Sequence, residues 1–126
     1  IRMPNGLFMH YRGLTGEIYQ DRSGNMRLSD AHYEGTKRAK IYIYGGAFTE
    51  NIVQSLARII VGDQMLEIGD QYRIVTMSHD EIGALASNKQ AKACEAFMAK
   101  VMRTPPYWCA DLPLDMESGY DRSYSK

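Results

Sequence analysis

Three adjacent ionisable residues, His79, Asp80 and Glu81, lie between two stretches that favour β-strands. The surrounding sequence "RIVTMSHDEIGAL", residues 73–85, predicts a hairpin with these residues at its apex. Carboxylate and imidazole side chains can bind metal ions, so the apex could form half of a metal site. A solvated turn is the alternative, because turns favour Asp and hold charge at no cost. Stiff flanking strands would fix the carboxylates in place, which favours a functional role, but the turn alone leaves both interpretations open.

A second polar set lies on a predicted helix over residues 50–68. Asn51, Gln54 and Arg58 are spaced at i, i+3 and i+7, so they share one side of that helix. Two amides and a guanidinium suit contacts to minor-groove base edges, sugars and phosphates. A plain solvated helix face is the alternative interpretation.

Two helices are predicted to carry and support these residues. Thr49 is the expected N-cap of the first helix, and Gly69 follows its last residue. Its core-facing stripe is Ile52, Val53, Leu56, Ile59 and Ile60. The second helix is predicted over residues 88–102, ends before Pro105-Pro106, and has the inward residues Ala91, Cys94, Phe97, Met98 and Val101.

The remaining segments complete an α+β fold. Residues 1–12 predict a hairpin, and residues 13–40 predict a polar loop or irregular excursion in which Met26 and Leu28 could form a short strand. "KIYIYGG" (40–46) predicts a short strand ended by two glycines. "LPLDME" (112–117) predicts a last short strand, and residues 117–126 a polar tail. Together they predict a mainly antiparallel sheet that includes a metal-binding hairpin and is backed by two helices.

Composition narrows the classes of function. The chain has 126 residues, enough for one domain, and 15 basic residues balance 15 acidic ones, unlike the basic excess of many nucleic-acid binders. No apolar run approaches the roughly 20 residues that span a bilayer, so no membrane partner is expected. Cys94 and Cys109 are too few and too widely spaced for a zinc site, and Cys94 is expected to be a reduced core thiol of an intracellular protein. There is no glycine-rich phosphate-binding motif.

Four stretches, in order, resemble the C-terminal palm segment of family A DNA polymerases, the group of bacterial DNA polymerase I and many phage replicases. The resemblance covers most of the chain beyond the polar loop, and phage-type members are the most similar. It implies that residues 1–126 are a palm fragment of such an enzyme. The stretches are "MPNGLFMHY", "YGGAFTENIVQSLAR", "IVTMSHDEIGAL" and "LPLDMESGY".

The resemblance implies roles for individual residues. Asp80 matches the carboxylate that holds the catalytic Mg²⁺ ions, Glu81 a supporting acid, and His79 a residue near the primer terminus. The implied DNA contacts on the helix are Gln54, which matches a side chain that reads the minor groove, with Asn51 and Arg58 on the same face. Departures from the family pattern are Ala47, where a Lys is common, and Ser78 and Gly83, where bulkier apolar residues are common.

The second metal-binding carboxylate of the family, in a strand resembling Asp-x-Ser-x-Ile-Glu-Leu-Arg, has no counterpart here, and neither has the fingers helix. Two-metal phosphoryl transfer needs carboxylates from more than one segment. The chain is therefore expected to be the C-terminal part of a split or cleaved DNA polymerase, inactive until a partner fragment supplies the fingers, the thumb and the rest of the palm. Its other expected partners are Mg²⁺, primer–template DNA and the incoming deoxynucleotide, in the cytoplasm of a bacterial or phage-infected cell.

Two alternatives belong to other classes. One is a non-catalytic DNA-binding or structural module of palm-like shape, which would not need Asp80. The other is a metal phosphohydrolase that uses His79 and Asp80 with His10 and His32. Ligands of such sites are commonly set on helices, whereas His79 and Asp80 are predicted on a hairpin.

Overall fold

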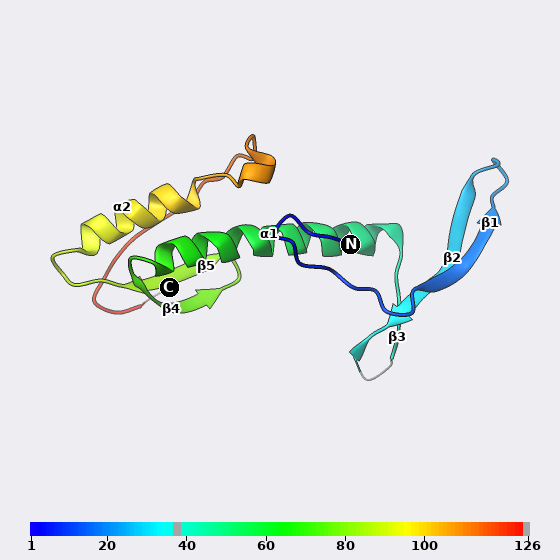
Figure 1. Ribbon diagram of the computed structural model, residues 1–126, viewed down its shortest axis with the longest axis horizontal. Helices are drawn as coiled ribbons and strands as arrows, with labels where there is room; N and C mark the ends of the chain where they lie inside the picture. The colour runs from blue at the N-terminus through cyan, green and yellow to red at the C-terminus, as the bar shows by residue number, and fades with distance from the viewer. Residues whose placement is uncertain (37–38, 125–126) are drawn as a thin grey trace. The chain divides into compact units, whose positions relative to one another are not determined.

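The computed structural model describes residues 1–36 and 39–124, so parts of the predicted loop (37–38) and tail (125–126) lie outside the described residues. The chain divides into two compact units, Ile1–Leu56 and Ala57–Lys126, where the length had suggested one. The described elements, labelled in Figure 1, are β1 (Thr15–Gln20), β2 (Met26–Glu34), β3 (Lys40–Tyr42), α1 (Gly45–Gly69), β4 (Arg73–Ser78), β5 (Glu81–Leu85), α2 (Ala91–Met102) and the 3₁₀ turn η2 (Tyr107–Cys109).

The first unit contains a three-stranded antiparallel sheet in the order β1-β2-β3. The predicted polar loop over 13–40 is therefore wrong for most of its length. Ile18 pairs with Leu28 across the two strands, yet both side chains are mostly exposed. Because β1 is exposed along its whole length, it lacks the apolar-in, polar-out alternation by which a half-buried strand is recognised.

Local turn chemistry closes the β1–β2 hairpin. The Asp21 carboxylate accepts hydrogen bonds from the backbone N–H groups of Ser23 and Asn25, both at 2.9 Å, and from Arg27 Nε at 2.9 Å. These donors, Arg27 first among them, hold the pKa of Asp21 below its usual range. The predicted hairpin over 1–12 is present only as an isolated bridge between Arg2 and Phe8.

Helix α1 begins at Gly45, several residues before the predicted start. Thr49 is not an N-cap: it lies inside the helix, and its hydroxyl donates to the carbonyl oxygen of Gly45 at 3.0 Å. The end at Gly69 agrees with the prediction. The predicted core-facing stripe is only partly covered, because Val53 is 58% exposed.

The core of the second unit joins α1, the β4–β5 hairpin and α2. Ile68, Ile82 and Val101 form its buried centre. Cys94 and Val101 of α2 are buried and Phe97 and Met98 pack against the core, which confirms those inward positions of the predicted helix. Burial also raises the pKa of the Cys94 thiol, as expected of an unreactive core cysteine.

The predicted single sheet is wrong, because β4 and β5 form a separate two-stranded antiparallel sheet. The predicted strand over 112–117 is also wrong: that segment adopts no strand structure. Hydrogen bonds from the Arg103 side chain hold this segment instead. Arg103 donates from Nε to Asp115 Oδ1 at 2.8 Å and from Nη2 to the Met116 carbonyl oxygen at 2.9 Å. Within residues 1–36 and 39–124, no helix combines the length and apolar content needed to cross a bilayer.

Candidate functional site at the β4–β5 hairpin

The predicted hairpin over residues 73–85 is confirmed, with His79 and Asp80 as its two-residue turn. Ser78 pairs with Glu81, so Glu81 is the first residue of β5 rather than part of the turn. His79 has φ 54°, in the left-handed region that side chains rarely adopt and in which His is one of the more tolerated residues. Such strained backbone is concentrated at functional sites, which makes the apex a candidate site.

Gly83 allows the two strands to pair closely beside a bulge. It lies opposite Thr76, and the ladder shifts register between Ile74 and Thr76. A Cβ atom on Gly83 would lie 2.5 Å from Thr76 Cγ2, a separation that requires one of them to move. The contact with Thr76 therefore gives a local steric reason why position 83 is occupied by Gly rather than by a bulkier residue.

Replacing Gly83 with Ala is expected to lower the free energy of unfolding by about 1 kcal/mol through this overlap. The companion change Thr76→Ser removes the Cγ2 methyl group, so Gly83→Ala in that background is expected to be neutral or slightly stabilising. Urea unfolding of the four proteins measures both effects. An equal cost in both backgrounds would show that the overlap with Thr76 is not the cause.

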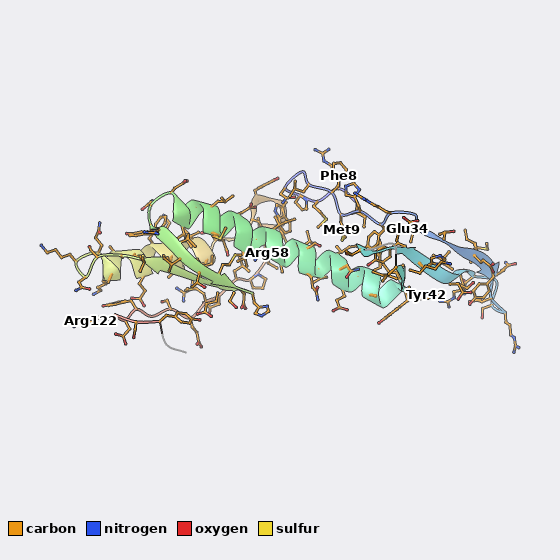
Figure 2. All side chains as sticks on the ribbon, turned by 90° about the horizontal axis from the view of Figure 1, so that it is seen from below. Phe8, Met9, Glu34, Tyr42, Arg58 and Arg122 are labelled. Atoms are coloured by element: carbon orange, nitrogen blue, oxygen red, sulfur yellow. The ribbon has the colours of Figure 1, made fainter. Side chains whose placement is uncertain are left out.

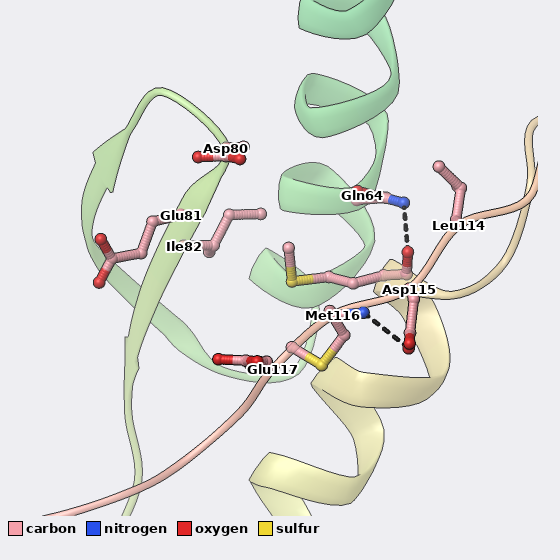
Figure 3. Close-up of a pocket in the computed structure, with 9 residues that line it drawn as sticks. Gln64, Asp80, Glu81, Ile82, Leu114, Asp115, Met116 and Glu117 are labelled. Carbon is pink, nitrogen blue, oxygen red and sulfur yellow. Dashed lines mark hydrogen bonds between the residues drawn. The ribbon is translucent and has the colours of Figure 1, made fainter.

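A pocket of about 600 Å³ opens beside the hairpin within the second unit (Figure 3). Four carboxylates contribute to its lining, and no Lys, Arg or His of the described residues does so. This composition favours cations over anions. The lining residues are Gln64, Asp80, Glu81, Ile82, Met102, Leu114, Asp115, Met116 and Glu117.

The two neighbouring acids of the hairpin differ in their surroundings. Asp80 is exposed at the apex, whereas Glu81 is half-buried. Figure 3 shows the Glu81 and Ile82 side chains on opposite sides of β5, and Ile82 is the one that enters the core. Tyr124 donates a hydrogen bond from Oη to Glu81 Oε1 at 2.8 Å. Asp80 is thus open to a ligand, while Glu81 is engaged by the C-terminal segment.

Asp115 is committed to an ion pair. The hydrogen bond from Arg103, followed by that from the Met116 backbone N–H, lowers its pKa from the ordinary range. The Asp115 carboxylate therefore stabilises the folded state at pH values above the pKa that it has in the unfolded chain. This stabilisation is lost as the pH falls through the lower pKa of the folded state. Because the carboxylate is exposed, solvent screens this contribution.

Acidic, histidine and cysteine side chains of the described residues do not gather into a cluster of metal ligands. Within residues 1–36 and 39–124 there is no group of three or more His, Cys, Asp or Glu side chains arranged to hold one. Asp80 fits a Mg²⁺ ion as a single ligand, because Mg²⁺ is commonly held by one or two carboxylates with water and phosphate oxygens.

The predicted DNA-contact residues have different partners. Asn51, in the first unit, is half-buried and donates from Nδ2 to Tyr11 Oη at 3.1 Å. Gln54 is exposed and donates to Glu50 within the helix at 3.0 Å. Arg58 (Figure 2), in the second unit, is exposed and places Nη1 3.2 Å from Met77 Sδ in β4. Asn51 therefore has an internal packing contact, whereas Gln54 and Arg58 present polar groups to solvent.

Gln64, which lines the pocket, is a residue that helical spacing could have singled out from the sequence. Gln64 lies on the same i, i+4 row as Ile60 and Ile68, so the sequence places a polar side chain on an apolar row. It is 8% exposed and donates from Nε2 to the Met102 carbonyl oxygen at 3.0 Å, which joins α1 to the end of α2. The contact of Tyr124 with Glu81 has no comparable signal, because the two residues are 43 positions apart.

Comparisons with protein-family models, with curated proteins and with solved structures find no match to the chain. Over residues 1–36 and 39–124, the structure defines an α+β protein with two small antiparallel sheets and two α-helices.

Proposed function

We propose that the chain is the C-terminal palm part of a split or cleaved family A DNA polymerase, which adds deoxynucleotides to a primer 3′ end in the cytoplasm of a bacterial or phage-infected cell. The observation that carries the proposal is the exposed carboxylate of Asp80 at the apex of the β4–β5 hairpin. This placement supports the role that the family resemblance of "IVTMSHDEIGAL" implies. The hairpin packs through Ile82 against Ile68 of α1, the helix that also contains "TENIVQSLAR".

In this proposal Asp80 holds Mg²⁺ together with a carboxylate of the partner fragment, and Glu81 supports it. The bound ion would stabilise the charge that develops on the transferred phosphate. His79 lies beside Asp80 and would face the primer terminus. Gln54 and Arg58 supply exposed polar groups for the primer–template, and Asn51 is assigned to the same surface on the strength of the resemblance alone.

The exposed surface supports the need for a partner chain. In the described residues only six hydrophobic side chains are buried. Large apolar side chains left exposed in the second unit are Leu66, Val75, Leu85, Tyr107, Tyr120 and Tyr124. A partner fragment that covers part of this surface would bury apolar area and stabilise the chain.

The direct test is reconstitution. The chain is mixed with a fragment of a family A polymerase that carries the other palm carboxylate and the fingers, and primer extension is measured with Mg²⁺ and deoxynucleotides. Extension is expected from the mixture and not from either fragment alone. Metal-independent binding of primer–template without extension would overturn the proposal in favour of a non-catalytic DNA-binding module.

A further inference from the structure

The C-terminal segment, residues 115–124, covers the end of the predicted last strand and most of the predicted polar tail, and it is fastened to other parts of the second unit at three places. Arg103 at the end of α2 holds Asp115 and the Met116 carbonyl oxygen. Ser118 Oγ then donates to Glu95 Oε1 of α2 at 3.0 Å. Finally, Tyr124 Oη donates to Glu81 Oε1 at 2.8 Å. The segment therefore runs from the end of α2 to the first residue of β5, next to Asp80.

We infer that Tyr124 is a positioning residue, which holds the Glu81 carboxylate beside the proposed metal ligand Asp80. The inference rests on the proposed function for its catalytic consequence. A glutamate side chain has three rotatable bonds, so a free carboxylate at this position would sample many orientations. A hydrogen bond from a phenol to a carboxylate is charge-assisted and directional, which restricts that freedom.

The position of Tyr124 favours this role over one in packing. Its side chain is 64% exposed, so its ring contributes little to a core. The described contact joins its hydroxyl to a functional candidate in a strand 43 residues away. Tyr120, in the same segment and 60% exposed, has no such contact and provides a matched control.

The first arm of the test uses the chain by itself. Backbone order parameters from ¹⁵N relaxation are measured over residues 118–124 in the unsubstituted chain and in Tyr124→Phe, Glu81→Ala and Tyr120→Phe variants. Tyr124→Phe and Glu81→Ala are expected to lower the order parameters of this segment from about 0.8 to below about 0.6, because the fastening is lost, while Tyr120→Phe leaves them unchanged. Equal order parameters in all four proteins would overturn the inference.

The second arm uses the reconstituted polymerase. Tyr124→Phe is expected to lower kcat by about threefold to tenfold with an unchanged KM for the deoxynucleotide, whereas Tyr120→Phe has no effect. In a Glu81→Ala background, Tyr124→Phe should cause a smaller loss than in the unsubstituted chain, because the contact that joins the two side chains is already absent. Equal kcat for Tyr124→Phe and Tyr120→Phe would overturn the positioning role.

The two arms separate failure of this inference from failure of the proposed function. If the unsubstituted mixture shows no extension, the proposed function is overturned, and the catalytic role of Tyr124 with it. The fastening of the segment to Glu81 is then judged by the backbone order parameters alone.

Discussion

Replacement of Asp80 by Asn is expected to reduce primer extension by the reconstituted polymerase by about a thousandfold or more. The substitution keeps the size of the side chain and removes the negative charge that would hold Mg²⁺. Because Asp80 is exposed at the hairpin apex, the fold should tolerate the change, and the free energy of unfolding should shift by less than about 0.5 kcal/mol. Rates of single-nucleotide addition and urea unfolding of the same preparation measure the two effects.

Asp70→Asn is the matched control for charge removal. Asp70 is an exposed aspartate in the turn that follows α1, in the same unit as Asp80. Its substitution should leave extension unchanged. Chelation of Mg²⁺ should abolish extension by the unsubstituted mixture, and added Mg²⁺ should restore it. Extension that survives Asp80→Asn would contradict the assignment of Asp80, even if the mixture were a polymerase.

The second large effect is expected on stability. Ile68→Ala should lower the free energy of unfolding of the second unit by about 2–5 kcal/mol. Ile68 is fully buried, at 0% exposure, and meets Ile82 and Val101 at the centre of the core. Small domains are stabilised by only about 5–15 kcal/mol, so this loss is a large fraction of the total. Urea unfolding followed by circular dichroism gives the measurement.

Leu66→Ala supplies the comparison within the same helix. Leu66 is 68% exposed, two residues from Ile68, and its removal should change the free energy of unfolding by less than about 0.5 kcal/mol. Similar losses for Leu66→Ala and Ile68→Ala would show that the core is not centred on Ile68. Because Ile82 connects the hairpin to this core, Ile68→Ala should also reduce extension by the reconstituted enzyme.

Local signals in the sequence were sufficient for the hairpin and for the second helix. In residues 73–85, strand-forming residues flank a polar stretch, so the hairpin follows from neighbouring residues. The sequence placed His79, Asp80 and Glu81 together at the apex, whereas the structure assigns Glu81 to β5. In α2, the repeat of Cys94, Phe97 and Val101 marked the buried face, because helical periodicity is a property of the segment itself.

The start of α1 depended on contacts beyond the segment. Two glycines at Gly45 and Gly46 are typical of a strand end, yet the helix begins there. Phe48, in its first turn, packs against Tyr11, with ring centroids 5.4 Å apart. Packing of this kind outweighs the weak helix propensity of glycine, and propensity alone cannot reveal it.

The sequence by itself determined the hairpin and the helical periodicities, since both are patterns of neighbouring residues. Only the tertiary structure decided how the strands divide into two sheets, that Gln64 is bonded to the end of α2, and that Tyr124 contacts Glu81. Such contacts join residues far apart in the chain. They form only when packing of the core brings those residues together, and no local pattern encodes that proximity.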